Sequence, residues 1–466
     1  MGLISDKKYD LGYAALEAVI QSPSFAKLSS DDRHRALYVA GAVAVNLKRT
    51  KEGYAYSVLS SEMPETTGDD WDVRIYAASH LELTADLLHS LTVLAQRWPN
   101  QLAGHKDEFI EQTIWAAKKQ PENSEALLDL MQTLFDVKWK SDQHVEPSWM
   151  WRDLTLALIE KGRMDAAIKV AERVTDPYDV IAMRIDNRFS SVVRAHPEHF
   201  NVDAAATRHL KELEAAAQAL PKKLRWRRAV AESLRQQRHY AAALGALDSI
   251  IAEVASVSDA KAYYSDYDDE WVWVLNDRAK VLQRLGRRAE AEQQYLQAVQ
   301  LHEGGTTTNV SQRINLALTY CGWGQPEKAL KSLEPLTSGS TSSYGTMVMN
   351  IVRVEAGQQL HDKTMTDAAL AAMALNQNDS DKAYEEALIK ANHLDEAATL
   401  LITRLADPKK RLDALLTIQD YAPWAMPEQH TKELNARWRS VVERPSVAAA
   451  IAKVGSIETI QLEAPH

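Results

Sequence analysis

The chain has 466 residues, of which 45% are hydrophobic and 25% charged, and its formal net charge is −10. Because single hydrophobic cores stop growing at roughly 250–300 residues, this length indicates several domains or one elongated solenoid. The acidic balance argues against nucleic-acid binding, which needs a basic field to displace counterions from phosphates. No run of about 18 apolar residues is present, so no transmembrane segment is expected.

The composition favours helices. Only 17 glycines and 15 prolines interrupt a chain rich in Ala, Leu, Glu, Gln and Arg, the residues that lose least side-chain freedom in a helix. The best strand-like stretch is short and runs from Ser456 to Leu462. The single cysteine, Cys321, excludes an intrachain disulfide and a thiolate metal cluster. We therefore predict an all-α fold.

The first residues, Met1 to Asp6, have neither the basic region nor the apolar run of a signal peptide. They also miss the myristoylation pattern, which needs Ser or Thr at the position of Asp6. A cytoplasmic location is therefore the first expectation, and a periplasmic or exported mature form is the alternative.

The N-terminal part, residues 1–145, is helical by its periodicity but has few repeat landmarks. Trp71 and Pro99 fit the first and last positions of one repeat unit, and Gly41 with Gly53 suggests another. We expect degenerate helical repeats here.

The clearest repeat unit runs from Leu275 to Ala298, where two amphipathic segments flank Gly286. Ala279 and Ala291 are small because two antiparallel helices are expected to cross there, and Gly286 can take the left-handed conformation that ends a helix. The next unit repeats this arrangement around Gly324, and its extra length falls in the loop 304–308. A weaker preceding unit has Arg238 at the turn, and a further copy surrounds Gly162.

The C-terminal part contains a segment whose sequence pattern repeats that of an earlier segment. Residues 157–167, followed by Asp176-Pro177, parallel residues 387–397, followed by Asp407-Pro408. The Ser- and Gly-rich stretch 337–345 precedes this part and is the best candidate for a hinge or a subdomain boundary.

These units resemble the tetratricopeptide repeat (TPR), whose motif has small residues at the helix crossing, a Gly in the turn and an aromatic residue in the second helix. The resemblance is closest over 225–335 and weaker over 149–177 and 383–408. It implies a right-handed α-α superhelix of roughly 10–12 helical hairpins. The expected division is degenerate repeats over 1–145, TPR-like repeats over 146–336 and C-terminal helical repeats over 346–466.

No catalytic motif is present: the sequence has no Gly-rich phosphate loop, His-Glu-x-x-His motif, nucleophile elbow or Rossmann fingerprint. His196 and His199 lack a third ligand for zinc. Asp266 and Asp268 begin like a calcium loop, but Trp271 replaces the required Gly, so carboxylates at a helix N-terminus explain this stretch better. We expect no cofactor and no metal.

The basic run 222–228 permits three interpretations. It could be a nucleic-acid patch, a solvated helix face or the basic part of a peptide-binding groove, and the acidic chain makes the first the weakest.

The resemblance also implies which residues would face the concave side of the superhelix, because TPR proteins present fixed first-helix positions there. Counting back from Arg238, Gly286 and Gly324, these positions hold Arg225, Arg228, Glu232, Trp273, Asn276, Asp277, Lys280 and Asn315. Cations, amides and one aromatic ring on one face would suit a peptide backbone and a carboxylate. Taking Arg228 and Lys280 as surface residues, we expect reversal of both charges to abolish partner binding with little change in melting temperature.

The predicted function is therefore a protein-interaction scaffold that binds a protein or an acidic or extended peptide in its concave groove, and not an enzyme. The alternatives are an enzyme built on an α-superhelix, which would need a cleft with paired carboxylates, and a regulatory protein that senses a small ligand. Neither the partner nor the oligomeric state follows from the sequence.

Overall fold

The computed structural model describes residues 9–301, 309–336, 339–423 and 429–465. The loop 304–308, and parts of the expected hinge at 337–345 and of the segment 423–427, lie outside these residues. The structure forms two compact units, Met1–Arg173 (unit 1) and Val174–His466 (unit 2), which are described separately. The three-part division expected from the sequence stays a prediction.

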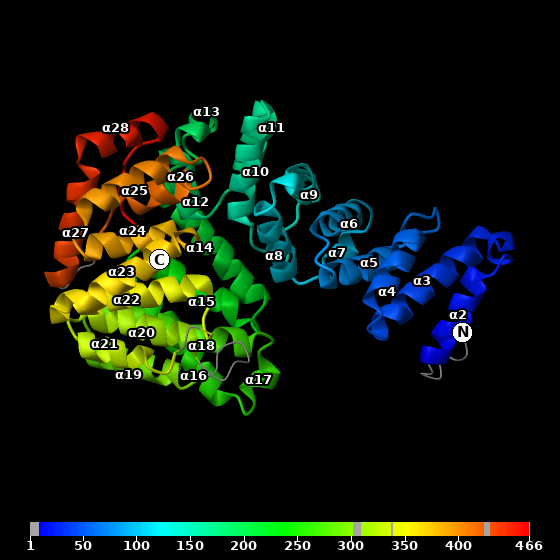
Figure 1. The fold of residues 1–466 in the computed structure, drawn as a ribbon, viewed down its shortest axis with the longest axis horizontal. Coiled ribbons are helices and arrows are strands. Elements are labelled where there is room, and N and C mark those ends of the chain that lie inside the picture. Colours follow the sequence, from blue (N-terminus) through cyan, green and yellow to red (C-terminus); the bar gives the residue numbers. More distant parts are fainter. Residues whose placement is uncertain (1–8, 302–308, 337–338, 424–428, 466) are drawn as a thin grey trace. The chain divides into compact units, whose positions relative to one another are not determined.

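Unit 1 is a succession of helices (Figure 1). In chain order they are α2 (Tyr9–Gln21), η1 (Phe25–Lys27), α3 (Ser30–Asn46), α4 (Thr50–Ser61), α5 (Gly68–His80), α6 (Thr84–Arg97), α7 (Pro99–Leu102), α8 (Asp107–Lys118), η2 (Pro121–Asn123), α9 (Ser124–Asp136), α10 (Ser148–Glu160) and α11 (Met164–Ala171).

The two early glycines belong to a helix crossing in unit 1. A Cβ on Gly41 would lie 3.3 Å from the Gly53 carbonyl oxygen, and a Cβ on Gly53 would lie 3.2 Å from the Gly41 carbonyl oxygen. Helices α3 and α4 therefore pack backbone to backbone at this point. Trp71 is buried on α5, and Pro99 is the first residue of α7.

Unit 2 contains the remaining helices and two very short strands. They are α12 (Pro177–Ile185), η3 (Asn187–Phe189), α13 (Ser190–Ala195), α14 (Val202–Ala219), α15 (Leu224–Gln236), α16 (Tyr240–Ser256), α17 (Ala260–Tyr263), α18 (Tyr267–Arg284), α19 (Arg288–Val299), α20 (Val310–Gly322), α21 (Pro326–Leu333), α22 (Ser343–Leu360), α23 (Lys363–Leu375), η4 (Gln377–Asp379), α24 (Asp381–Lys390), α25 (Leu394–Ala406), α26 (Arg411–Thr417), β1 (Asp420–Tyr421), α27 (Gln429–Val442), α28 (Pro445–Val454) and β2 (Thr459–Ile460).

Many of the hairpin turns contain a residue in the left-handed conformation. Gly286 has φ +73° and Gly324 has φ +68°, as predicted, and the predicted crossing residues Ala279 and Ala291 are fully buried. In other hairpins the same conformation is held by residues other than glycine, namely Lys48, Glu82, Arg238, His361 and Asn392. The all-α, TPR-like solenoid expected from the sequence is thus confirmed, and the repeat is more regular in structure than in sequence.

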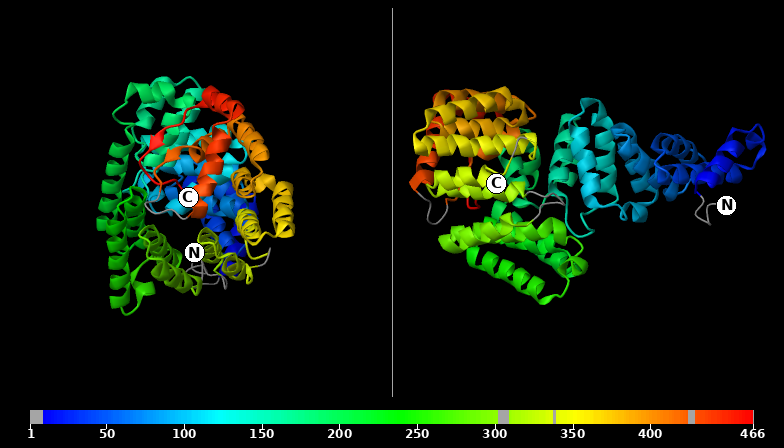
Figure 2. Two further views of the ribbon diagram at one scale, coloured as in Figure 1. Left: turned by 90° about the vertical axis from the view of Figure 1, so that its left-hand side faces the viewer. Right: turned by 60° about the horizontal axis from the view of Figure 1, so that its bottom comes forward.

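Unit 2 closes on itself. Helix α12, at its start, packs against α26, near its end, and β1 pairs with β2 in parallel. Asp186 forms an isolated bridge with Gly455, and the Ser456 N–H donates to the Ile185 carbonyl (3.0 Å). In Figure 2, left, the helices of unit 2 curve around the end of the chain. The segment 455–465 therefore lies on the inner side of the curve.

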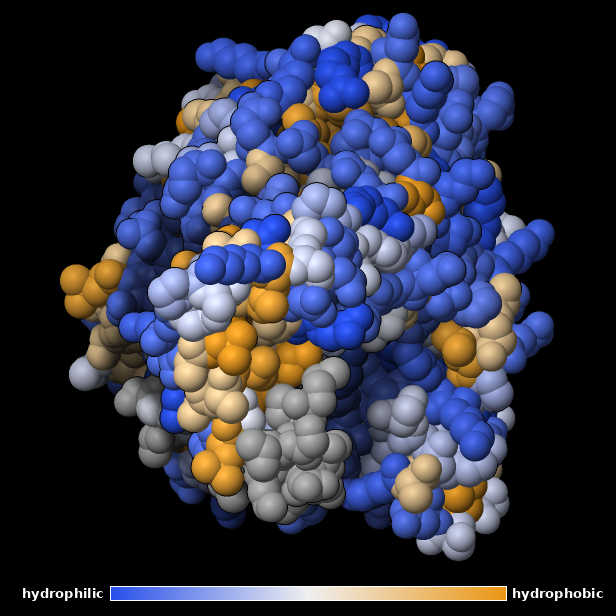
Figure 3. Space-filling model, turned by 90° about the vertical axis from the view of Figure 1, so that its right-hand side faces the viewer, coloured by the Kyte–Doolittle hydropathy of each residue, from blue (hydrophilic) through white to orange (hydrophobic). Residues whose placement is uncertain are grey.

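Two apolar clusters form the core of unit 2. One joins the hairpins from α15 to α22, and the other joins α12 to the helices from α22 onward and includes Ile460 and Leu462. The face seen in Figure 3, which is the side of helices α2 to α5 in Figure 1, carries hydrophobic patches separated by hydrophilic residues. Among the described residues, no helix combines the length and apolarity needed to cross a membrane.

Candidate functional site

Several first helices of the hairpins in unit 2 pack against one another: α15 against α18, α20 against α22, and α22 against α24. Trp226, Ala231, Val274 and Ala279 point into the core, which leaves the polar residues of both helices on another face. The eight residues predicted to line the groove lie on three helices: Arg225, Arg228 and Glu232 on α15, Trp273, Asn276, Asp277 and Lys280 on α18, and Asn315 on α20.

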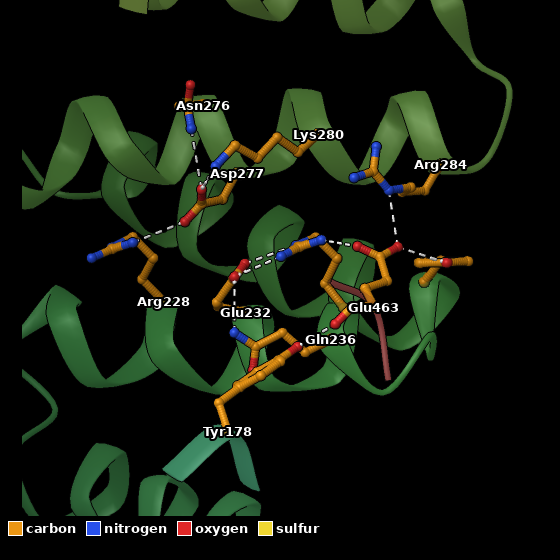
Figure 4. A network of polar contacts seen from close by, with 11 residues as sticks. Tyr178, Arg228, Glu232, Gln236, Asn276, Asp277, Lys280, Arg284 and Glu463 are labelled. Carbon is orange, nitrogen blue, oxygen red and sulfur yellow. Dashed lines mark hydrogen bonds and ion pairs between the residues drawn. The ribbon is translucent and has the colours of Figure 1, made fainter. Parts of the chain in front are cut away.

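An ion-pair network joins α15 to α18 (Figure 4). The Arg228 guanidinium donates to Asp277 (2.9 Å) and to Glu270 (2.6 Å), and Lys280 Nζ lies 3.7 Å from Asp277 Oδ1. Burial alone would lower the pKa of Arg228, but the two carboxylates outweigh it and hold the pKa above its ordinary value. The predicted cations are therefore largely neutralised within the chain.

The assumption that Arg228 is a surface residue is wrong. Its side chain is only 27% exposed and lies between Glu270 and the buried Asp277. Reversal of its charge would place three carboxylates together, one of them buried, so the double reversal with Lys280 should lower the melting temperature. Such a variant cannot separate binding from folding.

Two amides extend the network to α20. Asn315 Nδ2 donates to Asn276 Oδ1 (3.0 Å), and Asn276 Nδ2 donates to Asp277 Oδ1 (3.2 Å). Asn276 is fully buried. The predicted amides thus connect α18 to α20, and the contact of Asp277 with Arg228 continues the network to α15.

The remaining two predicted residues have other surroundings. The Arg225 guanidinium carbon lies 4.4 Å from the centroid of the Trp226 ring. Trp273 is half-buried and packs against the apolar cluster of Val272, Leu275 and Ala298. The structure therefore brings six of the eight predicted residues into polar contacts around Asp277 and Glu232.

Asp266 caps α15 across the interface between hairpins. Its two carboxylate oxygens accept from the backbone N–H groups of Leu224 (2.8 Å) and Arg225 (2.9 Å). These are among the first N–H groups of α15, which have no partner within the helix. Asp268 lies in the first turn of α18, as predicted, and complements the helix dipole.

One further turn along α15 and α18 lies a buried carboxylate site that the sequence analysis did not predict. The Glu463 carboxylate accepts hydrogen bonds from Arg235, from Arg284 Nε (2.9 Å) and from the Tyr240 hydroxyl (2.7 Å). The side chains of Arg235, Arg284 and Glu463 are at most 2% exposed. We call Arg235, Arg284 and Tyr240 the carboxylate pocket (Figure 4).

The carboxylate pocket is continuous with the predicted groove face. Glu232 accepts from Arg235 Nη2 (2.7 Å) and from Gln236 Nε2 (3.1 Å). A signal was present in the sequence, because Arg235 follows Arg228 by two helical turns and Arg284 stands in the same relation to Asp277. Continuing the predicted face would have found both arginines, but no local pattern could have paired them with Glu463.

Backbone groups hold the peptide around Glu463. Its N–H donates to the Gln236 carbonyl (2.9 Å), and its carbonyl accepts from the Tyr178 hydroxyl (2.7 Å). Three residues earlier in the segment, the Ile460 carbonyl accepts from the Ala422 N–H (2.8 Å). The segment 455–465 is therefore held both by its main chain and by one acidic side chain.

The two guanidinium groups and the carboxylate of Glu463 interact electrostatically within the carboxylate pocket. Burial lowers the pKa of Arg284, Glu463 opposes this, and the neighbouring Arg235 lowers the pKa further. Burial and the hydrogen bond to Glu463 raise the pKa of Tyr240. Two buried guanidinium groups that repel each other need a carboxylate between them.

Within the described residues, no three His, Cys, Asp or Glu side chains are grouped to hold a metal ion. His199 Nε2 instead lies 3.0 Å from the Val174 carbonyl oxygen.

Comparisons with known proteins concern the fold. No family model matches the sequence, and a search of curated proteins finds no match. Among solved structures, the chain is similar to yeast Tom70, with 12% identity over 97% of each chain and a TM-score of 0.36. It is also similar to the P58(IPK) TPR domain, with 13% identity, 87% of this chain and 97% of that one covered, and a TM-score of 0.22. A third similar structure is that of Naa15/Naa10 bound to HypK-THB, with 12% identity, 97% of this chain and 78% of that one covered, and a TM-score of 0.22. Such low scores do not bear on which partner this chain binds.

Proposed function

We propose that this protein is an interaction scaffold that binds a protein partner through an extended peptide on the first-helix face of unit 2. The observation that carries the proposal is the segment 455–465, a non-helical peptide that contains the short strand β2 and is seated against α12, α15, α16 and α18. A face that holds one peptide through main-chain and carboxylate contacts has the chemistry to hold another.

The polar network around Asp277 supports the same proposal. Lys280 is 23% exposed and lies beside the buried Asp277, so its ammonium group can reach a ligand while its position is fixed. Asn315 and Asn276 supply amide groups on the adjoining helix. Amides and cations on rigid helices are suited to a peptide main chain and an acidic side chain.

Selection of random short peptides on the purified full-length chain tests the proposal. We expect selected peptides to be rich in acidic residues and to bind the Lys280→Gln variant about tenfold more weakly, the value of one charge-assisted hydrogen bond. Lys331→Gln is the matched control, because Lys331 is an exposed lysine on the second helix α21.

Equal binding to the wild type and to both lysine variants would place the peptide site outside the first-helix face. Failure to select any peptide would contradict the scaffold function itself. Lys331→Gln should leave the melting temperature unchanged within a few degrees, since substitutions at exposed sites change stability by only about 0.5 kcal/mol. Because Lys280 is only 23% exposed and lies beside Asp277, the melting temperature of Lys280→Gln is measured as well, and binding is compared at a temperature at which both variants are folded.

A further inference from the structure

We propose that the carboxylate pocket is a peptide-recognition site that the chain's own segment 455–465 occupies as an intramolecular ligand, and that a partner peptide of the same pattern binds by displacing it. This inference rests on the proposed function and names the chemistry of the partner: an extended peptide with the order apolar, any residue, apolar, acidic. The occupied site would then be the closed form of the scaffold.

The pattern follows from which side chains of the segment are buried. Ile460 and Leu462 are 2% and 3% exposed and belong to the apolar core, and Glu463 is 1% exposed. Gln461 between them and Ala464 after them are exposed. The site therefore contacts two apolar side chains and one carboxylate of the segment. It makes no demand on the exposed side chain at the position of Gln461.

The carboxylate supplies the specificity. Arg235 and Arg284 belong to the helices α15 and α18, whereas Glu463, which accepts hydrogen bonds from both, belongs to the segment 455–465. Without Glu463 the pocket would lose the carboxylate that Arg235 and Arg284 share, while Arg235 would keep its hydrogen bond to Glu232. Such a pocket favours another carboxylate over a neutral side chain, because buried positive charge is stabilised by a negative charge beside it.

Outside the carboxylate pocket the segment is held by backbone hydrogen bonds and by its two buried apolar side chains, and a partner peptide of the same pattern would have to replace the contacts beyond Gly455. β1 and β2 pair over two residues each, and a two-stranded pair of this length contributes little by itself. At the start of the segment, Gly455 is fixed close to the end of α12, since a Cβ there would collide with the Ile185 carbonyl oxygen. The part beyond Gly455 can therefore leave while its start stays anchored.

A labelled peptide with the sequence of residues 455–465, capped at both ends, tests the inference by fluorescence anisotropy. The wild-type chain should bind it weakly, because the tethered segment competes at an effective concentration in the millimolar range. In the full-length Glu463→Gln variant the competitor loses its charged hydrogen bonds, and the peptide should bind about tenfold or more tightly. Glu458→Gln, in the same segment, should leave peptide binding unchanged, since Glu458 pairs with the more exposed Arg184 outside the pocket.

A second peptide with Gln at the position of Glu463 shows whether binding depends on the carboxylate or only on the apolar side chains. On the Glu463→Gln chain it should bind about tenfold more weakly than the Glu peptide. On the Glu463→Gln/Arg284→Gln chain, which keeps the net charge of the wild type, the two peptides should bind within about threefold of each other, because the preference should largely disappear with one of the two guanidinium groups. Hydrogen exchange at 459–465 gives a second readout, and it should accelerate in Glu463→Gln and not in Glu458→Gln.

Equal affinity of the Glu peptide for the wild-type and Glu463→Gln chains overturns the inference, as does equal affinity of the Glu and Gln peptides or no binding to either chain. In each case the segment 455–465 is a fixed part of the fold. Random peptides that bind the wild type and depend on Lys280 would still uphold the proposed function, so the two failures are distinguishable.

Discussion

Side-chain contacts of acidic groups in the two units join residues at very different separations along the chain. In unit 1, Arg74 binds Asp86, 12 residues away, and His34 contacts Asp70, 36 residues away. In unit 2, Glu463 binds Arg235 and Arg284, which are 228 and 179 residues away. Unit 1 thus uses contacts between neighbouring hairpins, as solenoids do, and unit 2 adds contacts that exist only when its two ends have come together.

This difference predicts different unfolding behaviour. Hairpins held by nearest-neighbour contacts lose stability locally and approximately additively. A contact between the ends of unit 2 couples all hairpins in between, so a substitution that removes this contact should lower the stability of the whole unit. The following variants test this contrast, from the largest expected effect to the smallest.

Glu463→Ala should destabilise unit 2 by about 3–5 kcal/mol, because it leaves Arg235 and Arg284 buried without their shared carboxylate. Urea denaturation should show a lower midpoint for unit 2 and an unchanged transition for unit 1. Glu458→Ala is the control and should change stability by no more than about 0.5 kcal/mol. Equal effects of the two variants would mean that the pocket is hydrated and does not close the unit.

Gly455→Ala should cost about 1–3 kcal/mol, because the new methyl group would meet the Ile185 carbonyl oxygen and lie 2.9 Å from a Leu415 methyl carbon. Gly245→Ala is the matched control. Gly245 lies within α16 with nothing within 4 Å of an added Cβ, so this change should stabilise the helix by about 0.5–1 kcal/mol. Shifts of opposite sign in the melting temperature are the expected result, and shifts of the same sign would contradict the tight approach at Gly455.

The pair of Glu385 with Arg404 provides a local contact inside unit 2 for comparison. Burial raises the pKa of Glu385 from 4.5 to about 7 against the opposing Arg404, and within the described residues its Oε1 atom has no hydrogen-bond partner. Because the folded pKa lies above the unfolded value, the carboxyl group's contribution to stability is complete below pH 4.5, declines as the pH rises and is absent above about 7.

Melting temperatures across this pH range, measured for the wild type and Glu385→Gln, check that prediction. The wild type should lose stability relative to Glu385→Gln as the pH rises, and by less than the Glu463 variant loses, because Arg404 still compensates the charge. A difference between the two chains that does not vary with pH would show that Glu385 is ionised throughout. Asp413, which also binds Arg404, is present in both chains, so its own titration does not contribute to the difference between them.

The smallest effects concern the turns. Lys48 holds a left-handed conformation (φ 60°) in unit 1 and is exposed, whereas Gly286 holds it (φ +73°) in unit 2. Lys48→Gly should stabilise and Gly286→Ala destabilise, each by about 0.5–1 kcal/mol, because only glycine adopts this conformation without strain. Thermal unfolding that shifts in the same direction for both variants would argue against equivalent turns.

The sequence by itself determined the repeat. Small residues at Ala279 and Ala291 and the turn at Gly286 predicted the hairpin correctly, because helix crossings and left-handed turns impose local requirements on residue type. The turns at Lys48 and Glu82 escaped notice, since the left-handed conformation is strained but not forbidden for such residues. The groove face was predicted as a set of positions on three helices, and its role in binding stays a prediction.

Only the tertiary structure decided what these polar residues contact. Periodicity identifies a helix face, but it does not show that Asp277 neutralises Arg228 or that Glu463 lies between Arg235 and Arg284. Glu463 is separated from Arg284 by 179 positions and from Arg235 by 228 positions. Whether such distant residues meet depends on the combined curvature of all the hairpins between them, which no local sequence pattern specifies. The stretch 456–462 was recognisable as extended, yet its place against α12, α15 and α18 arises only when unit 2 closes.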